Sequence, residues 1–177
     1  MSEQNIDEEK MNVFLFYKSI YDRELKRRID LDNSINIPIT ILTLVIGLNS
    51  IYIHKFLFRE LGIIQILSVI IGVTIIMSIF FIIKSYNNLF KGFKYQNLPL
   101  TKEIREYETK DMPEYNSKVE EEYKLSFEDY IINQLIETTD SHISFNDRRS
   151  LDIYKAKVFL IISLILTSIQ LIIVTFK

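Results

Sequence analysis

The chain has 177 residues, a formal net charge of −2 and no cysteine. The near-neutral charge gives no overall attraction to nucleic acid, and the lack of cysteine excludes disulfides, thiol nucleophiles and cysteine-based metal sites. Hydrophobic residues make up 48% of the sequence, glycine and proline are scarce, and no strand-like alternation occurs, so the composition predicts an all-α protein.

The first 34 residues predict an amphipathic helix. Apolar side chains recur at steps of three and four from Met11 to Ile29, which is the period of one helix face. Acidic residues 7–9 and the basic residues of 23–28 suit the positive and negative ends of the helix dipole. Asp32–Ser34 predicts a break or shallow bend before the next segment.

Two uncharged apolar runs follow almost back to back, at residues 35–53 and 61–83. A helix rises about 1.5 Å per residue and a bilayer core is about 30 Å thick, so each run is long enough to cross a membrane. Only seven residues, 54–60, separate them. The pair therefore predicts a tight antiparallel transmembrane hairpin.

Residues 84–157 form a charged segment with mixed signals. An apolar stripe from Tyr86 to Phe93 predicts that the second helix continues to Leu98–Pro99, and residues 99–124 predict a loop or a short helix. Ser126 resembles a helix N-cap. From Phe127 to Phe176 there is no proline or glycine, which predicts one long helix or a helix broken near residues 139–144.

A third uncharged run, 158–176, completes a prediction of three transmembrane helices. Six Lys or Arg precede the first run, two lie in the hairpin loop and twelve lie between Lys84 and Lys157. The positive-inside rule then places residues 1–34 and the helical region 84–157 in the cytoplasm, with the hairpin at 35–83 and the last span at 158–177. We therefore expect a multi-pass membrane protein with a cytoplasmic N-terminus. Because Ile, Leu, Lys, Glu and Asn dominate the composition, as is typical of AT-rich bacteria, we expect the membrane to be a bacterial inner membrane.

Polar and small residues share one face of the first span. They recur at helical spacing and stay within about 40° of one line: Asn36, Thr40, Thr43, Gly47 and Ser50. The second and third spans carry similar sets: Gln65, Ser68 and Gly72, then Ser163, Thr167 and Gln170.

These polar faces allow two interpretations. They can line a pore in a homo-oligomer, where hydroxyl and amide groups replace part of an ion's hydration. They can equally mark contacts between helices, because small residues let membrane helices approach closely. Repetition on three spans and the near absence of charge within them favour the pore, and the lack of an intramembrane carboxylate argues against proton-coupled transport.

Basic residues gather on both cytoplasmic sides of the predicted spans. The candidates for binding an anionic ligand, such as a nucleotide or a short oligonucleotide, are Arg27, Arg28, Arg148 and Arg149. The competing interpretation is a juxtamembrane basic band that is attracted to anionic membrane lipid.

Catalytic and metal chemistry find no support in the sequence. His54 and His142 lack metal-ligand spacing, the adjacent Asp140–His142 does not make a triad, and no glycine-rich phosphate loop occurs. We expect no enzyme activity, no metal and no cofactor.

The layout resembles a known class of proteins. The amphipathic helix leads into the hairpin through the segment YDRELKRRIDLDNSINIPITILTLVIG (21–47). A second segment leads into the last span, FNDRRSLDIYKAKVFLIISLILTSI (145–169), and it carries Asn146, Arg149 and Ala156 at helical spacing. This resembles the small multi-span effectors of bacterial anti-phage systems, of the Hailong-like, CBASS-like and SLATT types. The third span departs from the two-span SLATT pattern.

The resemblance implies an oligomeric channel that depolarises the infected cell. It also implies a gating ligand, a nucleotide or short single-stranded oligonucleotide made by a partner nucleotidyltransferase. The alternative is a non-conducting membrane anchor that recruits a soluble partner through its cytoplasmic helices.

Overall fold

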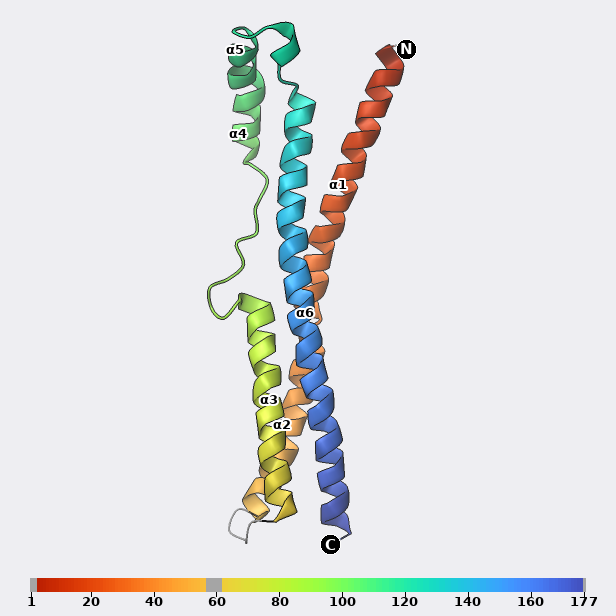
Figure 1. The fold of residues 1–177 in the computed structure, drawn as a ribbon, viewed down its shortest axis with the longest axis vertical. Helices are drawn as coiled ribbons and strands as arrows, with labels where there is room; N and C mark the ends of the chain where they lie inside the picture. The colour runs from red at the N-terminus through yellow and green to blue at the C-terminus, as the bar shows by residue number, and fades with distance from the viewer. Residues whose placement is uncertain (1–2, 57–61, 177) are drawn as a thin grey trace. The chain divides into compact units, whose positions relative to one another are not determined.

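The chain is all-helical in the computed structural model, which describes residues 3–56 and 62–176; helices make up 85% of the described residues, and no strand occurs in those ranges. The helices in chain order are α1 (Glu3–Asn33), α2 (Asn36–Phe56), α3 (Ile63–Asn87), α4 (Thr101–Glu106), the π-helical turn η1 (Tyr107–Asp111), α5 (Met112–Asn116), the 3-10 turn η2 (Glu121–Tyr123) and α6 (Phe127–Thr175) (Figure 1). The predicted all-α class is confirmed.

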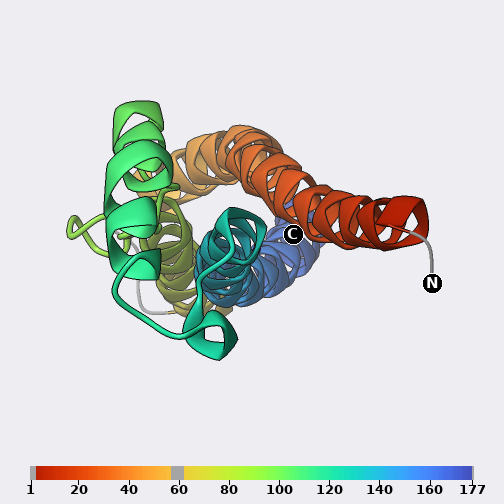
Figure 2. The ribbon, with the colours of Figure 1, turned by 90° about the horizontal axis from the view of Figure 1, so that it is seen from above.

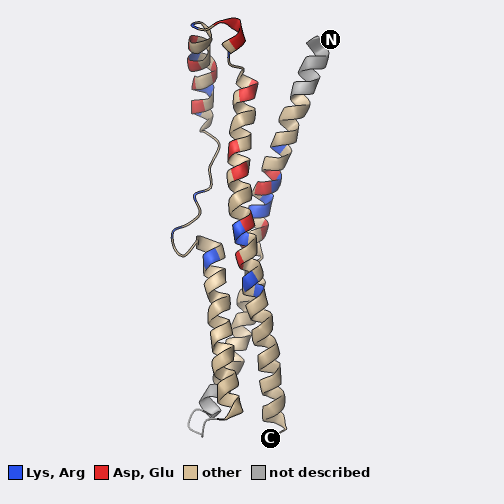
Figure 3. Ribbon diagram, in the orientation of Figure 1, with Lys and Arg blue, Asp and Glu red and all other residues tan. Residues whose placement is uncertain are grey.

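Three stretches are long and apolar enough to cross a membrane, as predicted: Met11–Tyr52, Ile63–Asn87 and Glu121–Thr175. Figure 3 shows no Lys, Arg, Asp or Glu on α2 over 36–52 or on α3 over 63–83. The predicted break between the first helix and the first span is also present, as a turn at Ser34–Ile35. Of the predicted hairpin loop, 54–60, residues 54–56 belong to the end of α2 and residues 57–60 lie outside the described residues.

The described chain forms two compact units. The first contains Met1–Arg28 and Lys94–Asn146, and the second contains Ile29–Phe93 and Asp147–Lys177. The boundaries fall inside α1 and α6, so each of these helices contributes to both units.

The second unit is a three-helix bundle in which α2, α3 and the end of α6 lie at the corners of a triangle when seen end-on (Figure 2). Buried positions recur at alternating steps of three and four on every helix, which is the seam of helices packed in the coiled-coil manner. These positions are Ile35 in the turn before α2, then Pro38, Leu42, Val45, Asn49 and Tyr52 on α2; Ile64, Ser68, Ile71, Ile75, Ser78, Ile82 and Ser85 on α3; and Arg149, Ile153, Ala156, Leu160, Ser163, Thr167 and Gln170 on α6.

Serines bring α3 against α6. The Ser78 hydroxyl donates to the Ala156 carbonyl oxygen at 2.9 Å, and the Ser85 hydroxyl donates to the Arg149 carbonyl oxygen at 3.1 Å. Direct bonds from a side chain to the neighbouring backbone require a close approach, which Ser and Ala permit because they are small. The rising numbers on α3 pair with falling numbers on α6, so the two helices are antiparallel.

The first unit packs short elements against the first part of α6. The Tyr107 ring stacks on Tyr130 of α6 with centroids 4.0 Å apart. The Asn116 side chain closes the connection to α6 through two bonds with the Leu125 backbone, at 2.8 and 3.0 Å. The sequence predicted either a loop or a short helix for residues 99–124, and the structure has the short helical elements α4, η1, α5 and η2 there.

Two sequence predictions about helix length have different outcomes. The helix from Phe127 is continuous to Thr175, without a break near 139–144. The predicted continuation of α3 to Leu98 is wrong, because α3 ends at Asn87 and the chain turns with positive φ at Asn88, Leu89 and Phe90. Asparagine tolerates this left-handed conformation, and the Asn87 side chain accepts from the Phe90 amide at 3.2 Å.

Candidate functional site

The polar line of the first span faces away from the chain's own bundle. Asn36, Thr40, Thr43, Gly47 and Ser50 are all exposed, while the buried seam of α2 is made by other positions. A Cβ added at Gly47 would meet nothing within 4 Å. The line is therefore not a contact surface between helices of the same chain.

Each hydroxyl on this line is bonded to its own helix. Thr40 Oγ1 donates to the Asn36 carbonyl oxygen at 3.1 Å, Thr43 Oγ1 to that of Ile39 at 3.0 Å, and Ser50 Oγ to that of Ile46 at 2.8 Å. A carbonyl oxygen can only accept, so the hydroxyl protons point at the helix backbone. The outward surface consequently presents oxygen lone pairs.

The polar sets on the other two spans behave differently. Ser68, Ser163, Thr167 and Gln170 are buried inside the bundle, and only Gln65 and Gly72 are partly exposed. For α3 and α6 the contact between helices is therefore the correct interpretation. Only α2 turns its whole polar set outward, so the repetition of polar residues on three spans no longer supports a pore.

A polar layer crosses the bundle near its loop end. Gln170 Nε2 donates to Ser68 Oγ at 2.7 Å, and Asn49 Nδ2 donates to the Ser68 carbonyl oxygen at 3.4 Å. The remaining amide oxygens, Asn49 Oδ1 and Gln170 Oε1, are buried without a hydrogen-bond partner in the described structure. A polar group of this kind in an apolar core fixes helix register at a cost in stability.

Arg149, a predicted ligand-binding residue, is a structural side chain of the second unit. Only 2% of the residue is exposed. Its Nε donates to the Ser85 carbonyl oxygen at 2.9 Å, and its guanidinium pairs with the Asp32 carboxylate. Arg149 of α6 thereby links the last turn of α1 to α3, whereas its neighbour Arg148 is exposed.

The other two predicted ligand-binding residues lie in the first unit and contact their own chain. Arg27 pairs with the buried Glu24 carboxylate at 3.4 Å, and the Arg28 guanidinium lies 4.3 Å from the centroid of the Tyr95 ring. Arg27 and Arg28 thus belong to one unit, and Arg148 and Arg149 belong to the other.

A buried polar cluster in the first unit escaped the sequence reasoning. Asn146 Nδ2 donates to the Glu24 carbonyl oxygen at 3.0 Å and to its carboxylate at 3.2 Å, and the Tyr95 hydroxyl donates to Asn146 Oδ1 at 3.0 Å. Glu24 was hidden among the charges of 22–28. The available signal was its position on the apolar side of the predicted helix, three turns after the stripe begins and one turn before Arg28.

His142 is enclosed in the same unit. Its Nε2 lies 3.1 Å from the Gln96 carbonyl oxygen, so Nε2 carries the proton, and Nδ1 is buried without a hydrogen-bond partner in the described structure. The Tyr95 and Tyr21 rings lie 4.8 and 5.9 Å away between centroids. Burial lowers the pKa of His142 below 6.5, aided by Arg28 and opposed by the Gln96 hydrogen bond and Glu24.

No metal site is found among the described residues, where no three His, Cys, Asp or Glu side chains gather. The side chain of His54, the other predicted non-ligand, lies outside the described residues. No family model, curated protein or solved structure matches this chain.

We expect Arg149→Ala to destabilise the protein by about 2–3 kcal/mol, because the substitution removes a charged donor from the Ser85 carbonyl and the Asp32 carboxylate. Arg148→Ala, on the exposed neighbour, should change the free energy of unfolding by less than about 0.5 kcal/mol. Denaturant melts of the two variants in detergent, followed by circular dichroism, compare them. Equal stability of both variants would contradict the structural role of Arg149.

We expect the first unit to lose stability as the pH falls below 6.5, because the folded pKa of His142 is depressed and the unfolded chain then binds the proton more readily. Above 6.5 this contribution is fully present. His142→Phe keeps an aromatic ring between Tyr21 and Tyr95 and should remove that part of the pH dependence. Thermal melts from pH 7.5 to about 5 test this, and an unchanged pH profile in the variant would refute it.

Proposed function

We propose that the chain assembles into a homo-oligomeric membrane channel whose pore is lined by the exposed polar line of α2. The observation that carries the proposal is the separation of two surfaces on one helix. The buried seam of α2 packs against α3 and α6, and the polar line of the same helix, which begins at Asn36 and ends at Ser50, is exposed.

The exposed surface of α3 provides the contrast. It is aliphatic, as a lipid-facing surface should be, and includes Ile63, Ile66, Val69, Ile70, Val73 and Ile76. The outward face of α2 instead carries a continuous line of hydroxyl, amide and glycine positions between aliphatic flanks. Such a line makes more favourable contacts with water, or with a second copy of the chain, than with lipid tails.

The chemistry of the line suits conduction of small ions. Its hydroxyl oxygens present lone pairs outward, and no charged side chain occurs along 36–52. Rings of such oxygens in an oligomer would replace part of an ion's hydration shell. Opening the channel in a bacterial inner membrane would depolarise the cell.

Gating by an anionic nucleotide or oligonucleotide, and a role in anti-phage defence, are part of the proposal on the strength of the resemblance in layout. Arg148 is the exposed candidate for contact with such a ligand, and Arg28 presents a guanidinium on the Tyr95 ring. Arg149 is better assigned to the bundle than to the ligand.

We expect Gly47→Leu and Thr43→Leu to reduce ion flux through liposomes to the level of empty vesicles, since both add bulk to the pore wall. The matched control is Gly72→Leu on α3, because a Cβ at either glycine meets nothing within 4 Å in the chain itself. Flux assays on reconstituted protein, with flotation to confirm insertion, measure the effect.

Wild-type flux in both α2 variants would overturn the pore assignment. Absence of flux from the wild-type protein, with normal insertion, would favour the non-conducting anchor. The same assay with and without short single-stranded oligonucleotides tests the gating ligand.

A further inference from the structure

Two ammonium groups from different helices meet at one aromatic ring of the second unit. Lys84 Nζ lies 5.8 Å and Lys155 Nζ 5.4 Å from the centroid of the Phe81 ring. Phe159, one turn after Lys155 on α6, stacks on Phe81 with centroids 5.8 Å apart and planes 10° from parallel. Both rings are partly exposed.

The charges in this cluster do not cancel. Lys84 Nζ pairs with the buried Asp152 carboxylate at 2.9 Å. Lys155 makes no ion pair within the part of the chain whose side chains are described. Two ammonium groups and one carboxylate leave one positive charge. A ring face attracts an ammonium but cannot accept all three of its N–H donors, so Lys155 retains donors for an anion.

The cluster lies at the boundary between apolar and charged sequence. Lys84 directly follows the uncharged run 61–83, and Lys155 precedes the run 158–176 by three residues. The bonds from Ser78 to Ala156 and from Ser85 to Arg149 set α3 and α6 antiparallel, so both lysines lie at the same end of the bundle. In a bilayer this is the level of the lipid headgroups.

We propose that Lys155, Lys84 and the stacked Phe81–Phe159 pair bind the headgroup of an anionic phospholipid. The Lys155 ammonium donates to the lipid phosphate, Lys84 adds long-range attraction, and the two rings contact the glycerol and the first acyl carbons. The inference rests on the membrane insertion in the proposed function, and it does not require conduction.

The test is native mass spectrometry of the full chain in micelles that contain equal amounts of phosphatidylglycerol and phosphatidylcholine. The wild type should retain phosphatidylglycerol preferentially. Lys155→Gln should lower the ratio of bound phosphatidylglycerol to phosphatidylcholine about fivefold, as expected for one lysine near an anionic headgroup. Lys155→Arg should restore the ratio, which separates loss of charge from misfolding.

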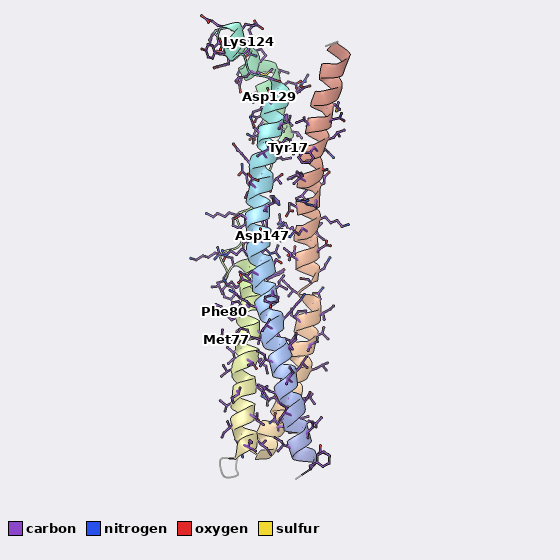
Figure 4. The ribbon with its side chains drawn as sticks, turned by 45° about the vertical axis from the view of Figure 1, so that its right-hand side comes forward. Tyr17, Met77, Phe80, Lys124, Asp129 and Asp147 are labelled. Atoms are coloured by element: carbon purple, nitrogen blue, oxygen red, sulfur yellow. The ribbon has the colours of Figure 1, made fainter. Side chains whose placement is uncertain are left out.

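Matched controls exist on both helices. Lys157→Gln removes the same charge two residues along α6, on another face, and should leave the ratio unchanged. Phe81→Leu should lower the ratio more than Phe80→Leu does, because the exposed Phe80 ring, labelled in Figure 4, meets Phe81 only edge-to-face with centroids 5.3 Å apart, and the two lysine contacts in the described cluster are with Phe81.

Equal losses in the Lys155 and Lys157 variants would overturn the proposal in favour of a diffuse basic band. Displacement of phosphatidylglycerol by equimolar inorganic phosphate would overturn it in favour of a free-phosphate site. Failure of the wild type to float with liposomes would instead refute membrane insertion, and loss of flux with normal lipid selectivity would concern the channel alone.

Discussion

The close contact between α3 and α6 determines which surfaces of the second unit face outward. Ser78 and Ser85 donate directly to carbonyl oxygens of α6, and Arg149 returns a bond to the Ser85 carbonyl. Such bonds fix both the rotation and the register of the two helices. Helix α2 packs against this pair through its buried residues Leu42, Val45 and Asn49. The polar line of α2 is made of other positions and therefore faces outward.

Polar groups therefore have two different settings within one apolar bundle. Ser68, Ser163, Thr167 and Gln170 are enclosed together with Asn49 of α2, where they hold the helices in register; the amide oxygens of Asn49 and Gln170 have no hydrogen-bond partner in the described structure, at a cost in stability. The five residues of the α2 polar line are exposed instead, and their hydroxyls donate within the helix. The first arrangement explains how the bundle holds together, and the second motivates the channel proposal.

The sequence predicted the elements well because long apolar runs and uninterrupted helical periodicity are strong signals. The three apolar helices and the break at Ser34 follow from them, and of the two alternatives left open for the chain after Phe127 the continuous helix is the one observed. It failed at the end of α3, where an apolar stripe outweighed the Asn87–Asn88 pair that stops the helix. A periodic pattern reports which residues share a face, and it does not report where the backbone turns.

The candidate site was less predictable, because periodicity cannot say what a face meets. The polar lines of α2, α3 and α6 look alike in sequence, yet α2 alone turns its line outward. Arg148 and Arg149 are adjacent and chemically identical, yet Arg149 is enclosed by Ser85 and Asp32 while Arg148 is exposed. Such distinctions depend on partners distant in sequence.

The most direct test of the account is the water accessibility of single cysteines in the reconstituted protein, since the natural chain contains none. Thr43→Cys should react with a membrane-impermeant thiol reagent and lose ion flux on modification. Val69→Cys, on the aliphatic surface of α3, and Ser163→Cys, in the buried seam, should stay unreactive. Protection of Thr43→Cys to the same degree as Val69→Cys would contradict the claim that the polar line of α2 faces a water-filled pore.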